Sequence, residues 1–402
     1  MKKLFCNEET IGTEFSISFY LQILFKTILM MSFFFFLTSC SEDVKVNPDP
    51  VITGFQPESA GAGDQVQIHG TDFGTSGDII FGDDMLPPDT WTDTCVYFTV
   101  PSGYIDTEQK IGLKINGKDY IAGTISILLR GEICITPDTY ASVGCWSQDG
   151  KRVFFIRSVN SDWDIYSVPW IGGEVTLVKH IPGDEAFLDV GFKSGKFLFC
   201  RNTGNINDPY KIYTASEDLS SVRRLYVAGE LSDPEVERRP AWNSGGGYPF
   251  YAWESVDTHN YTTIYVADDS QKEKIGEGYW PRFFPSNSGY AKLAYNVRTD
   301  DGGIAIVGKS FMGLDSDRDT IVSGKDVLVG FDISVDGRIV YSKRKAGRYI
   351  KDLWMINADG TNNHALIATD NDECEPRWSP DGNYLLFTRF TQDFHLYVAY
   401  VP

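Results

Sequence analysis

One acidic stretch of the sequence has the spacing of a cation-binding loop. Asp315, Asp317 and Asp319 alternate with other residues, and Asp326 stands at the twelfth position counted from Asp315. Alternating carboxylates present oxygen ligands that can wrap a hard cation such as Ca²⁺. Thr320 occupies the sixth position, where such a loop normally needs glycine for a sharp turn. The alternatives are a calcium site built from these four aspartates and a solvated acidic loop.

A second set of residues could stack on a ligand. Aromatic side chains recur on polar segments between apolar runs, and loops over a rigid scaffold commonly carry binding residues. Their flat apolar faces suit contact with sugar rings, whereas packing over strand ends is the alternative. The candidate ligand-binding aromatic residues are Trp163, Tyr210, Tyr261, Trp280 and Tyr349.

Basic residues recur at one position relative to the apolar runs. In a chain of net charge −19, such cations could focus an anionic ligand. The alternative is a cross-strand pair with an acidic residue of the next strand, such as Arg157 with Asp164 or Lys343 with Asp352. The candidate basic residues are Arg157, Arg201, Lys343 and Arg389.

Recognisable catalytic motifs are missing from the sequence. It contains no G-x-S-x-G nucleophile motif and no H-E-x-x-H zinc motif, and its five histidines are scattered. The cysteines show no zinc-ligand spacing. The negative net charge also opposes binding to nucleic acid. The sequence therefore predicts a protein that is not an enzyme and has no nucleic-acid partner.

A repeated turn organises the last two thirds of the chain. Residues 376–382, Pro-Arg-Trp-Ser-Pro-Asp-Gly, have turn chemistry and precede the apolar run 384–387. A second signal, typified by Asp-Ile-Tyr at 164–166, follows each turn at a distance of roughly 20 residues. Two phased signals in strand-like sequence predict a six-bladed β-propeller. The six anchor residues, spaced 41 to 50 residues apart, are Trp146, Phe192, Trp242, Phe283, Ile333 and Trp378.

This repeat resembles the WD-like repeat of TolB-type propellers, which has the same P-x-W-S-P-D-G turn, strand and D-I-Y sequence. The resemblance covers about residues 131–402. The last repeat has no outer strand of its own, and residues 131–136 precede the first anchor without belonging to a blade. We expect residues 131–136 to complete the sixth blade and close the ring, which removes exposed sheet edges.

Residues 51–129 show a different pattern of short apolar runs between turn signals, which predicts an all-β sandwich. The stretch 52–74, with Pro-Glu-Ser-Ala-Gly at 57–61 and Gly-Thr-Asp-Phe-Gly at 70–74, resembles the IPT/TIG immunoglobulin-like family. The resemblance implies a spacer or a protein-contact module. The expected fold class is all-β, with an immunoglobulin-like β-sandwich followed by a six-bladed β-propeller.

The amino-terminal segment has the pattern of an export signal. The apolar run 28–36 suits the hydrophobic part of a signal peptide, and a membrane-spanning anchor is the alternative. Residues 37–40, Leu-Thr-Ser-Cys, resemble the bacterial lipobox, which implies removal of residues 1–39 and lipidation of Cys40. Residues 41–43, Ser-Glu-Asp, resemble the surface-export signal of Bacteroidetes lipoproteins, or they form an ordinary acidic linker.

These segments predict a lipoprotein signal peptide at 1–39, a lipidated cysteine and tether at 40–50, an IPT/TIG domain at 51–129 and a TolB-like propeller at 131–402. The expected function is that of a non-enzymatic binding or scaffold module for a glycan or an envelope protein. A lipid anchor would hold it in the outer membrane, facing the cell surface or the periplasm. The alternatives are a propeller-type polysaccharide lyase and a periplasmic TolB-like partner of envelope proteins.

Overall fold

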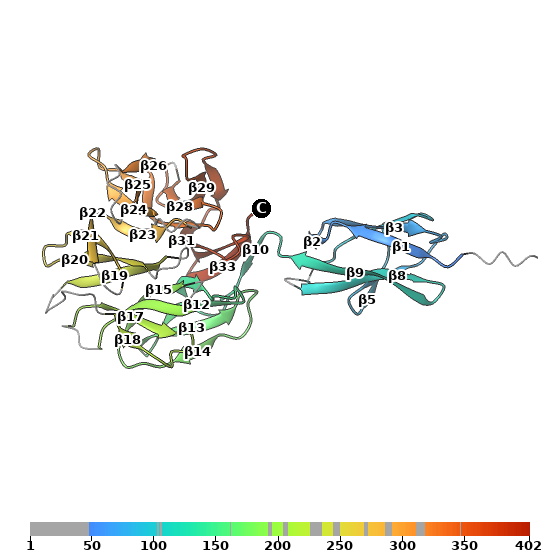
Figure 1. Ribbon diagram of the computed structural model, residues 1–402, viewed down its shortest axis with the longest axis horizontal. Coiled ribbons are helices and arrows are strands. Elements are labelled where there is room, and N and C mark those ends of the chain that lie inside the picture. The colour runs from blue at the N-terminus through green and yellow to red at the C-terminus, as the bar shows by residue number, and fades with distance from the viewer. Residues whose placement is uncertain are drawn as a thin grey trace, which may run out of the picture.

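Figure 1 shows a computed structural model of the protein, in which a small module and a larger one follow each other along the chain. The structure describes residues 48–102, 104, 107–160, 162–191, 195–203, 208–225, 235–243, 250–268, 272–285, 292–310, 318–345 and 347–402. The proposed signal segment 1–39, Cys40, Asp315 and Asp317 lie outside these residues. Within the described ranges, no helix has the length and apolar character needed to cross a membrane.

The first module is a β-sandwich of two sheets whose inner faces share one core. Apolar and polar residues alternate along the strands, so that each strand turns its apolar side chains to the core. In β3, for example, Val66 and Ile68 are fully buried, while Gln67 between them is half-exposed. The first sheet contains, in spatial order, β1 (Val51–Gln56), β3 (Gln65–Thr71), β7 (Cys95–Thr99) and β6 (Thr90–Trp91). The second contains β2 (Ser59–Gly61), β9 (Lys118–Leu128), β8 (Thr107–Ile115), β4 (Asp78–Phe81) and β5 (Asp84–Leu86).

The second module is a β-propeller, whose six four-stranded antiparallel sheets are the blades. Blade 1 contains β11 (Ser142–Trp146), β12 (Arg152–Val159), β13 (Asp162–Pro169) and β14 (Thr176–Lys179). Blade 2 contains β15 (Glu185–Gly191), β16 (Lys196–Arg201), β17 (Lys211–Ser216) and β18 (Arg223–Arg224). Blade 3 contains β19 (Val236–Trp242), β20 (Tyr251–Val256), β21 (Thr262–Ala267) and β22 (Lys272–Glu277).

The remaining blades follow the same order from the inner to the outer strand. Blade 4 contains β23 (Tyr279–Phe283), β24 (Lys292–Arg298), β25 (Ile304–Ser310) and β26 (Asp319–Gly324). Blade 5 contains β27 (Val327–Ile333), β28 (Arg338–Arg344), β29 (Lys351–Asn357) and β30 (His364–Ile367). Blade 6 contains β31 (Asp372–Trp378), β32 (Tyr384–Phe390), β33 (Phe394–Tyr400) and β10 (Glu132–Cys134). The predicted fold class is therefore confirmed.

Blade 6 joins the two ends of the ring, as the sequence predicted. Strand β10 pairs with β33, with Ile133 opposite Val398. The backbone nitrogen of Ile135 also donates a hydrogen bond to the carbonyl of Leu396, at 2.9 Å. On the inner side, the indole nitrogen of Trp146 donates to the carbonyl of Arg377 at 3.1 Å, which links blade 1 to blade 6.

The anchor residues lie at the turn ends of the inner strands, and most match the sequence prediction. Trp146 and Trp378 are each 2% exposed. In blade 2, however, Val190 holds the anchor position, because it pairs with Phe197 as Trp146 pairs with Val153. The predicted anchor Phe192 lies outside the described residues. The error of two residues arose because this repeat lacks the tryptophan that marks the turn in blades 1, 3 and 6.

The inner strands of blades 2 to 6 share an irregularity that the sequence pattern did not reveal. Each contains a β-bulge three residues before its anchor, where one residue takes a positive φ angle. Only one of the five residues is glycine, so the ring packing holds the others in an unfavourable backbone region. A bulge shifts the strand and redirects its side chains. The five residues are Phe187, Arg239, Trp280, Gly330 and Glu375.

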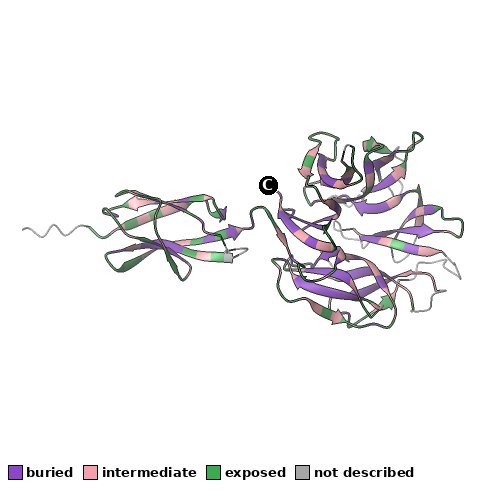
Figure 2. Ribbon diagram, turned by 180° about the vertical axis from the view of Figure 1, so that it is seen from behind, coloured by how far each residue is buried: buried purple, intermediate pink, exposed green. Residues whose placement is uncertain are grey.

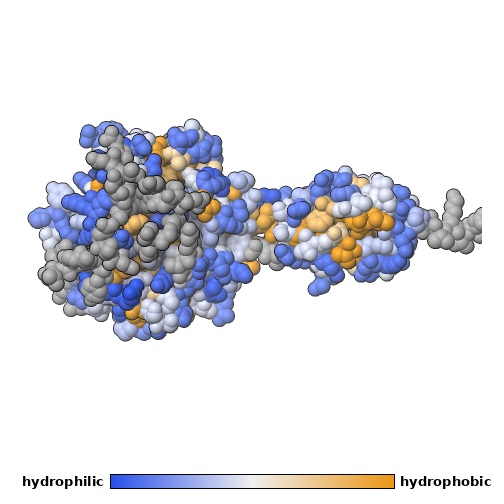
Figure 3. Space-filling view, viewed as in Figure 1, coloured by the Kyte–Doolittle hydropathy of each residue, from blue (hydrophilic) through white to orange (hydrophobic). Residues whose placement is uncertain are grey.

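Buried residues concentrate in the strands and exposed residues in the connections (Figure 2). Hydrophobic atoms gather on the visible face of the sandwich in Figure 3. Large hydrophobic side chains of this module that are exposed include Val51, Met85 and Ile121.

All five cysteines of the described residues are free thiols, so none of them forms a disulfide bond.

One side chain links the two modules. The guanidinium group of Arg130, between β9 and β10, donates to a carboxylate oxygen of Asp64 in the sandwich, with the Nη2 atom 2.9 Å from Oδ2. The same group lies over the ring of Tyr400 in blade 6, 4.6 Å from its centroid. Arg130 therefore contacts both modules at their junction.

Candidate functional site

A pocket of about 460 Å³ opens on the propeller at the ends of the inner strands opposite the turns. We call it the loop-side pocket. Three aromatic side chains, one acid and one base line it together with smaller residues, and they come from three blades. Its volume is in the range of small-molecule sites, which are mostly apolar with a few polar groups. These five lining residues are Trp163, Glu185, Phe187, Tyr210 and Arg238.

Strand positions explain how these side chains meet. Trp163 lies in β13 beside the connection to β12, opposite Ser158. Phe187 is the bulge residue of β15, with a φ angle of 52°. Tyr210 comes directly before β17, and its carbonyl accepts a hydrogen bond from the backbone nitrogen of Glu237 at 2.9 Å. The pocket thus depends on contacts between blades that lie far apart in the sequence.

Glu185 is the buried polar group of the pocket. Its side chain is completely covered, and neither carboxyl oxygen has a hydrogen-bond partner among the described residues. The Nε atom of Arg201 lies 3.3 Å from its Oε1 atom, an ion pair without hydrogen-bond geometry. Burial raises the pKa of Glu185 to about 8, Arg201 opposes this shift, and Asp164 and Asp162 add to it. At neutral pH the carboxyl group is mostly protonated, so it can both donate and accept a hydrogen bond.

Only some of the predicted ligand-binding aromatic residues line the loop-side pocket. Trp163 and Tyr210 line the loop-side pocket. Tyr261 and Tyr349 are 66% and 93% exposed on other loops and do not line it. Trp280 departs from the expectation, because it is the bulge residue of β23 and only 5% exposed.

Trp280 serves the interior of the propeller instead. Its indole nitrogen donates to the carbonyl of Phe331 at 2.9 Å, which ties blade 4 to blade 5. Three guanidinium groups surround its ring, those of Arg239, Arg282 and Arg377, at 4.9, 5.7 and 5.4 Å from the ring centroid. Contacts of this geometry are cation–π interactions. Burial therefore removes Trp280 from a ligand-contacting role on the open face.

The predicted basic residues do not form a ring of free cations. Arg201 pairs with Glu185, and the Nζ atom of Lys343 lies 3.3 Å from an oxygen of Asp326. Arg389 pairs with Glu373 at 2.9 Å and with Glu132 at 2.5 Å. Arg157 lies over the ring of Tyr166, 5.3 Å from its centroid. Strand register does place Arg157 opposite Asp164 and Lys343 opposite Asp352. Lys343 pairs instead with Asp326, and Asp164 faces His180.

The calcium alternative, which needed all four aspartates, conflicts with the positions of Asp319 and Asp326, whereas Asp315 and Asp317 lie outside the described residues. Residues 319–324 form strand β26, which pairs with β25, so Asp319 and Asp326 lie at opposite ends of an extended segment. An extended strand rises about 3.3 Å per residue, which separates these two carboxylates by roughly 20 Å. Asp319 pairs with Lys292 at 3.4 Å, and Asp326 pairs with Lys343. One ion cannot bind both aspartates.

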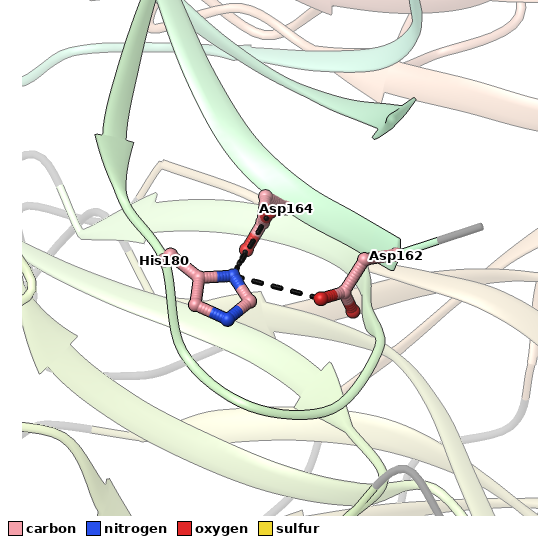
Figure 4. A group of neighbouring side chains, drawn as sticks. All are labelled: Asp162, Asp164 and His180. Atoms are coloured by element: carbon pink, nitrogen blue, oxygen red, sulfur yellow. Dashed lines mark hydrogen bonds and ion pairs between the residues drawn. The ribbon is translucent and has the colours of Figure 1, made fainter. Parts of the chain in front are cut away.

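Asp162, Asp164 and His180 form a group that the sequence reasoning missed (Figure 4). The Nδ1 atom of His180 faces both carboxylates, 3.1 Å from Asp164 and 3.6 Å from Asp162. One nitrogen and two carboxylates could hold a transition-metal ion. The hydrogen bond between His180 and Asp164 explains the same geometry without an ion. The acidic pair flanking Trp163 was the available sequence signal, but the position of His180 beside it depends on the pairing of β13 with β14.

Glu185, Phe187 and Arg238 were also missed by the sequence reasoning. Asp184-Glu185 precedes an apolar run, which marks an acid at the start of a strand but not its burial. Phe187 lies in a strand where alternation gives no sign of the bulge.

These observations define the class of protein: a sandwich followed by a six-bladed propeller that carries a ligand-sized pocket on its loop side.

Comparison with known families identifies the first module. Residues 50–127 match the IPT/TIG domain, so the sandwich is an IPT/TIG domain. The predicted family resemblance of this module is confirmed. No curated protein matches the chain.

Several solved structures resemble the chain at low identity. A putative TolB from Agrobacterium tumefaciens is 17% identical, with a TM-score of 0.47, and the match covers 67% of this chain and 97% of that chain. An auxiliary nutrient binding protein from Bacteroides ovatus is 10% identical, with a TM-score of 0.48 and coverage of 88% and 98%. An oligogalacturonate lyase from Vibrio parahaemolyticus is 12% identical, with a TM-score of 0.45 and coverage of 67% and 93%. At TM-scores below 0.5, these likenesses carry no argument about function.

Proposed function

We propose that the protein is a non-enzymatic binding module whose propeller holds part of a glycan in the loop-side pocket. The observation that carries this proposal is a pocket of about 460 Å³ walled by Trp163, Phe187 and Tyr210 around the buried carboxyl group of Glu185, whose oxygens have no hydrogen-bond partner among the described residues. A sugar ring presents an apolar face to aromatic side chains and hydroxyl groups to a polar one. Few polar groups in a mostly apolar pocket are what orient such a ligand.

The charge state of the pocket narrows the ligand further. Because Glu185 is mostly protonated at neutral pH, the pocket offers a neutral hydrogen-bonding group rather than a negative charge. Arg238, which is exposed at the pocket, adds a positive charge. This combination favours neutral sugars and sugars bearing a carboxylate, and it disfavours cationic ligands.

The test is a glycan array probed with the full chain, followed by calorimetric titration of the best ligand. Loss of aromatic contact in Trp163→Ala should weaken binding about tenfold or more. Glu185→Gln should retain part of the affinity, since an amide also donates and accepts hydrogen bonds. Tyr97→Ala, an aromatic truncation on the sandwich, is the matched control and should bind as the wild type does. Equal affinity of Trp163→Ala and wild type would exclude the loop-side pocket as the site.

An enzyme is the principal alternative outcome. Prolonged incubation of the best ligand with the full chain should leave the glycan intact by mass spectrometry. If the glycan is cleaved, and if substitution of Glu185 abolishes this cleavage, the protein is an enzyme rather than a binding module.

Cell-envelope anchoring is a separate part of the proposal. The lipobox-like residues 37–40 support lipidation of Cys40, with the IPT/TIG domain acting as a spacer between the membrane and the propeller. Cys40→Ala should leave an unprocessed precursor and abolish partitioning into detergent. Protease treatment of intact cells should degrade the protein if it faces the cell surface, and protection would assign it to the periplasm.

A further inference from the structure

A second cavity lies at the other end of the inner strands, where the Trp-Ser-x-x-Gly turns begin. We call it the turn-side cavity. Its volume is about 50 Å³, which accommodates one compact ion or a few water molecules but not a sugar. Four charged side chains line it, one from each of blades 2, 4, 5 and 6. They are Asp189, Arg282, Asp332 and Arg377.

Most of these charges are already engaged. The Nε atom of Arg282 lies 3.2 Å from Oδ1 of Asp332, and Oδ2 of Asp332 accepts a hydrogen bond from the backbone nitrogen of Trp378 at 2.8 Å. Oδ2 of Asp189 accepts a hydrogen bond from the backbone nitrogen of Trp242 at 2.7 Å. The acids at the cavity therefore already bind donors.

Arg377 differs from Arg282, the other cation of the cavity. It is 7% exposed and forms no ion pair with any residue that the structure describes. The hydrogen bond of its guanidinium group runs from Nη1 to the carbonyl of the adjacent Pro376, at 3.3 Å. The charge of Asp189 in the same cavity acts on Arg377 from beyond ion-pair distance, so it neutralises the guanidinium group only in part. An anion in direct contact would stabilise such a buried cation further.

The hydrogen-bonding groups of the lining residues are also unbalanced. Three buried nitrogen donors lack a hydrogen-bond or ion-pair partner among the described residues: the Nε atom of Arg377 and the indole nitrogens of Trp242 and Trp378. The Nε atom of Arg282 faces Asp332 without hydrogen-bond geometry. Within the same described ranges, none of the unpartnered buried acceptors belongs to a residue lining this cavity. Such an excess of donors complements an anion, which only accepts hydrogen bonds.

We propose that the turn-side cavity binds a compact monovalent anion, a carboxylate group or a halide, beside the guanidinium groups of Arg282 and Arg377. Planar guanidinium donors match the geometry of a carboxylate, and the enclosed site strengthens the attraction. Burial and then the charge of Arg377 lower the pKa of Arg282 to about 10, although the charges of Asp189 and Asp332 oppose this shift. An anion would relieve the repulsion between the two arginines. This site is separate from the glycan pocket on the loop side.

The experiment is thermal unfolding of the full chain at constant ionic strength. A bulky sulfonate buffer anion, too large for the cavity, is replaced stepwise by acetate or by bromide. A bound anion should raise the Tm progressively with its concentration, through mass action. Arg377→Gln should abolish this rise. Arg389→Gln is the matched control, because Arg389 is a buried arginine that pairs with Glu373 at 2.9 Å and does not line the cavity.

Two further experiments complete the test: a variant that keeps the charge of the cavity, and crystallographic location of the anion. Trp242→Phe removes one donor without a change in charge and should weaken the apparent affinity about tenfold. It serves in place of Arg377→Gln if that variant does not fold. Crystals grown with bromide should show an anomalous peak at Arg282 and Arg377. A response to acetate alone assigns a carboxylate site. No response to either anion and no peak, or equal responses in every variant, would overturn the proposal.

Discussion

At the scale of single residues, Glu185 combines a role in the pocket with a cost to the fold. Its carboxyl group is covered on all sides, and the nearby Arg201 compensates for only part of the burial, so the pKa rises to about 8. In the unfolded chain the same group has an ordinary pKa near 4.5. The difference between these two values links the pocket to the stability of the whole protein.

This linkage gives a pH dependence of definite sign. Between about pH 4.5 and about pH 8 the folded state holds a proton on Glu185 that the unfolded state has lost, so stability falls as pH rises. One proton contributes at most about 1.4 kcal/mol per pH unit. Glu185→Gln should flatten the decline in the free energy of unfolding, measured by urea denaturation across this range. An unchanged slope in the variant would show that Glu185 ionises normally in the folded state.

At the scale of the elements, the inner strands determine both candidate sites. Strand β15 begins at Glu185 in the loop-side pocket and carries Asp189 at the turn-side cavity. The bulge between these residues turns Phe187 toward the pocket side. The equivalent bulge in β23 instead buries Trp280 among three arginines. One repeated irregularity thus supplies a pocket wall in one blade and a packing residue in another.

Strand β10 gives a prediction at the same scale. Its loss removes the main-chain partners on the outer edge of β33, the hydrogen bond from the backbone nitrogen of Leu396 to the hydroxyl of Thr136, and the pair between Glu132 and Arg389. A chain that starts at residue 137 should therefore unfold about 5–10 °C below one that starts at residue 129. Differential scanning calorimetry of the two chains compares them directly. Equal Tm values would mean that the sixth blade does not need its outer strand.

At the scale of the whole molecule, Arg130 bridges the junction between the sandwich and the propeller. It makes two contacts there, the pair with Asp64 and the contact with the ring of Tyr400. Both partners are at the surface, and partly exposed pairs contribute only about 0–1 kcal/mol. These two contacts are therefore weak relative to the cores on either side of the junction.

Arg130→Ala should loosen the arrangement of the two modules without unfolding either one. Small-angle X-ray scattering should show a broader distribution of interatomic distances than the wild type, while the Tm changes little. Lys118→Ala, which removes a pair with Asp49 at the far end of the sandwich, is the control and should leave the scattering unchanged. A large loss of Tm in Arg130→Ala would instead indicate that the two modules unfold as one unit.

The sequence by itself determined the architecture, because its signals are local. The Pro-Asp-Gly turn at 380–382 and the apolar run that follows it specify a hairpin without reference to the rest of the chain. Six such repeats predicted the blades, and the unpaired segment 131–136 predicted the closing strand. The IPT/TIG domain was predictable for the same reason, since alternating residues and glycine turns lie close together in the sequence.

Only the tertiary structure decided which side chains meet. Trp163 and Trp280 are the same residue type in similar polar surroundings of the sequence, yet one lines the pocket and the other is buried. Arg201 pairs with Glu185 of the inner strand rather than with an acid of the next strand. Asp319 and Asp326 are close in sequence, and strand β26 separates them. The physical reason is that burial and ion pairing depend on bulges and on packing between blades, which bring together residues that no local pattern connects.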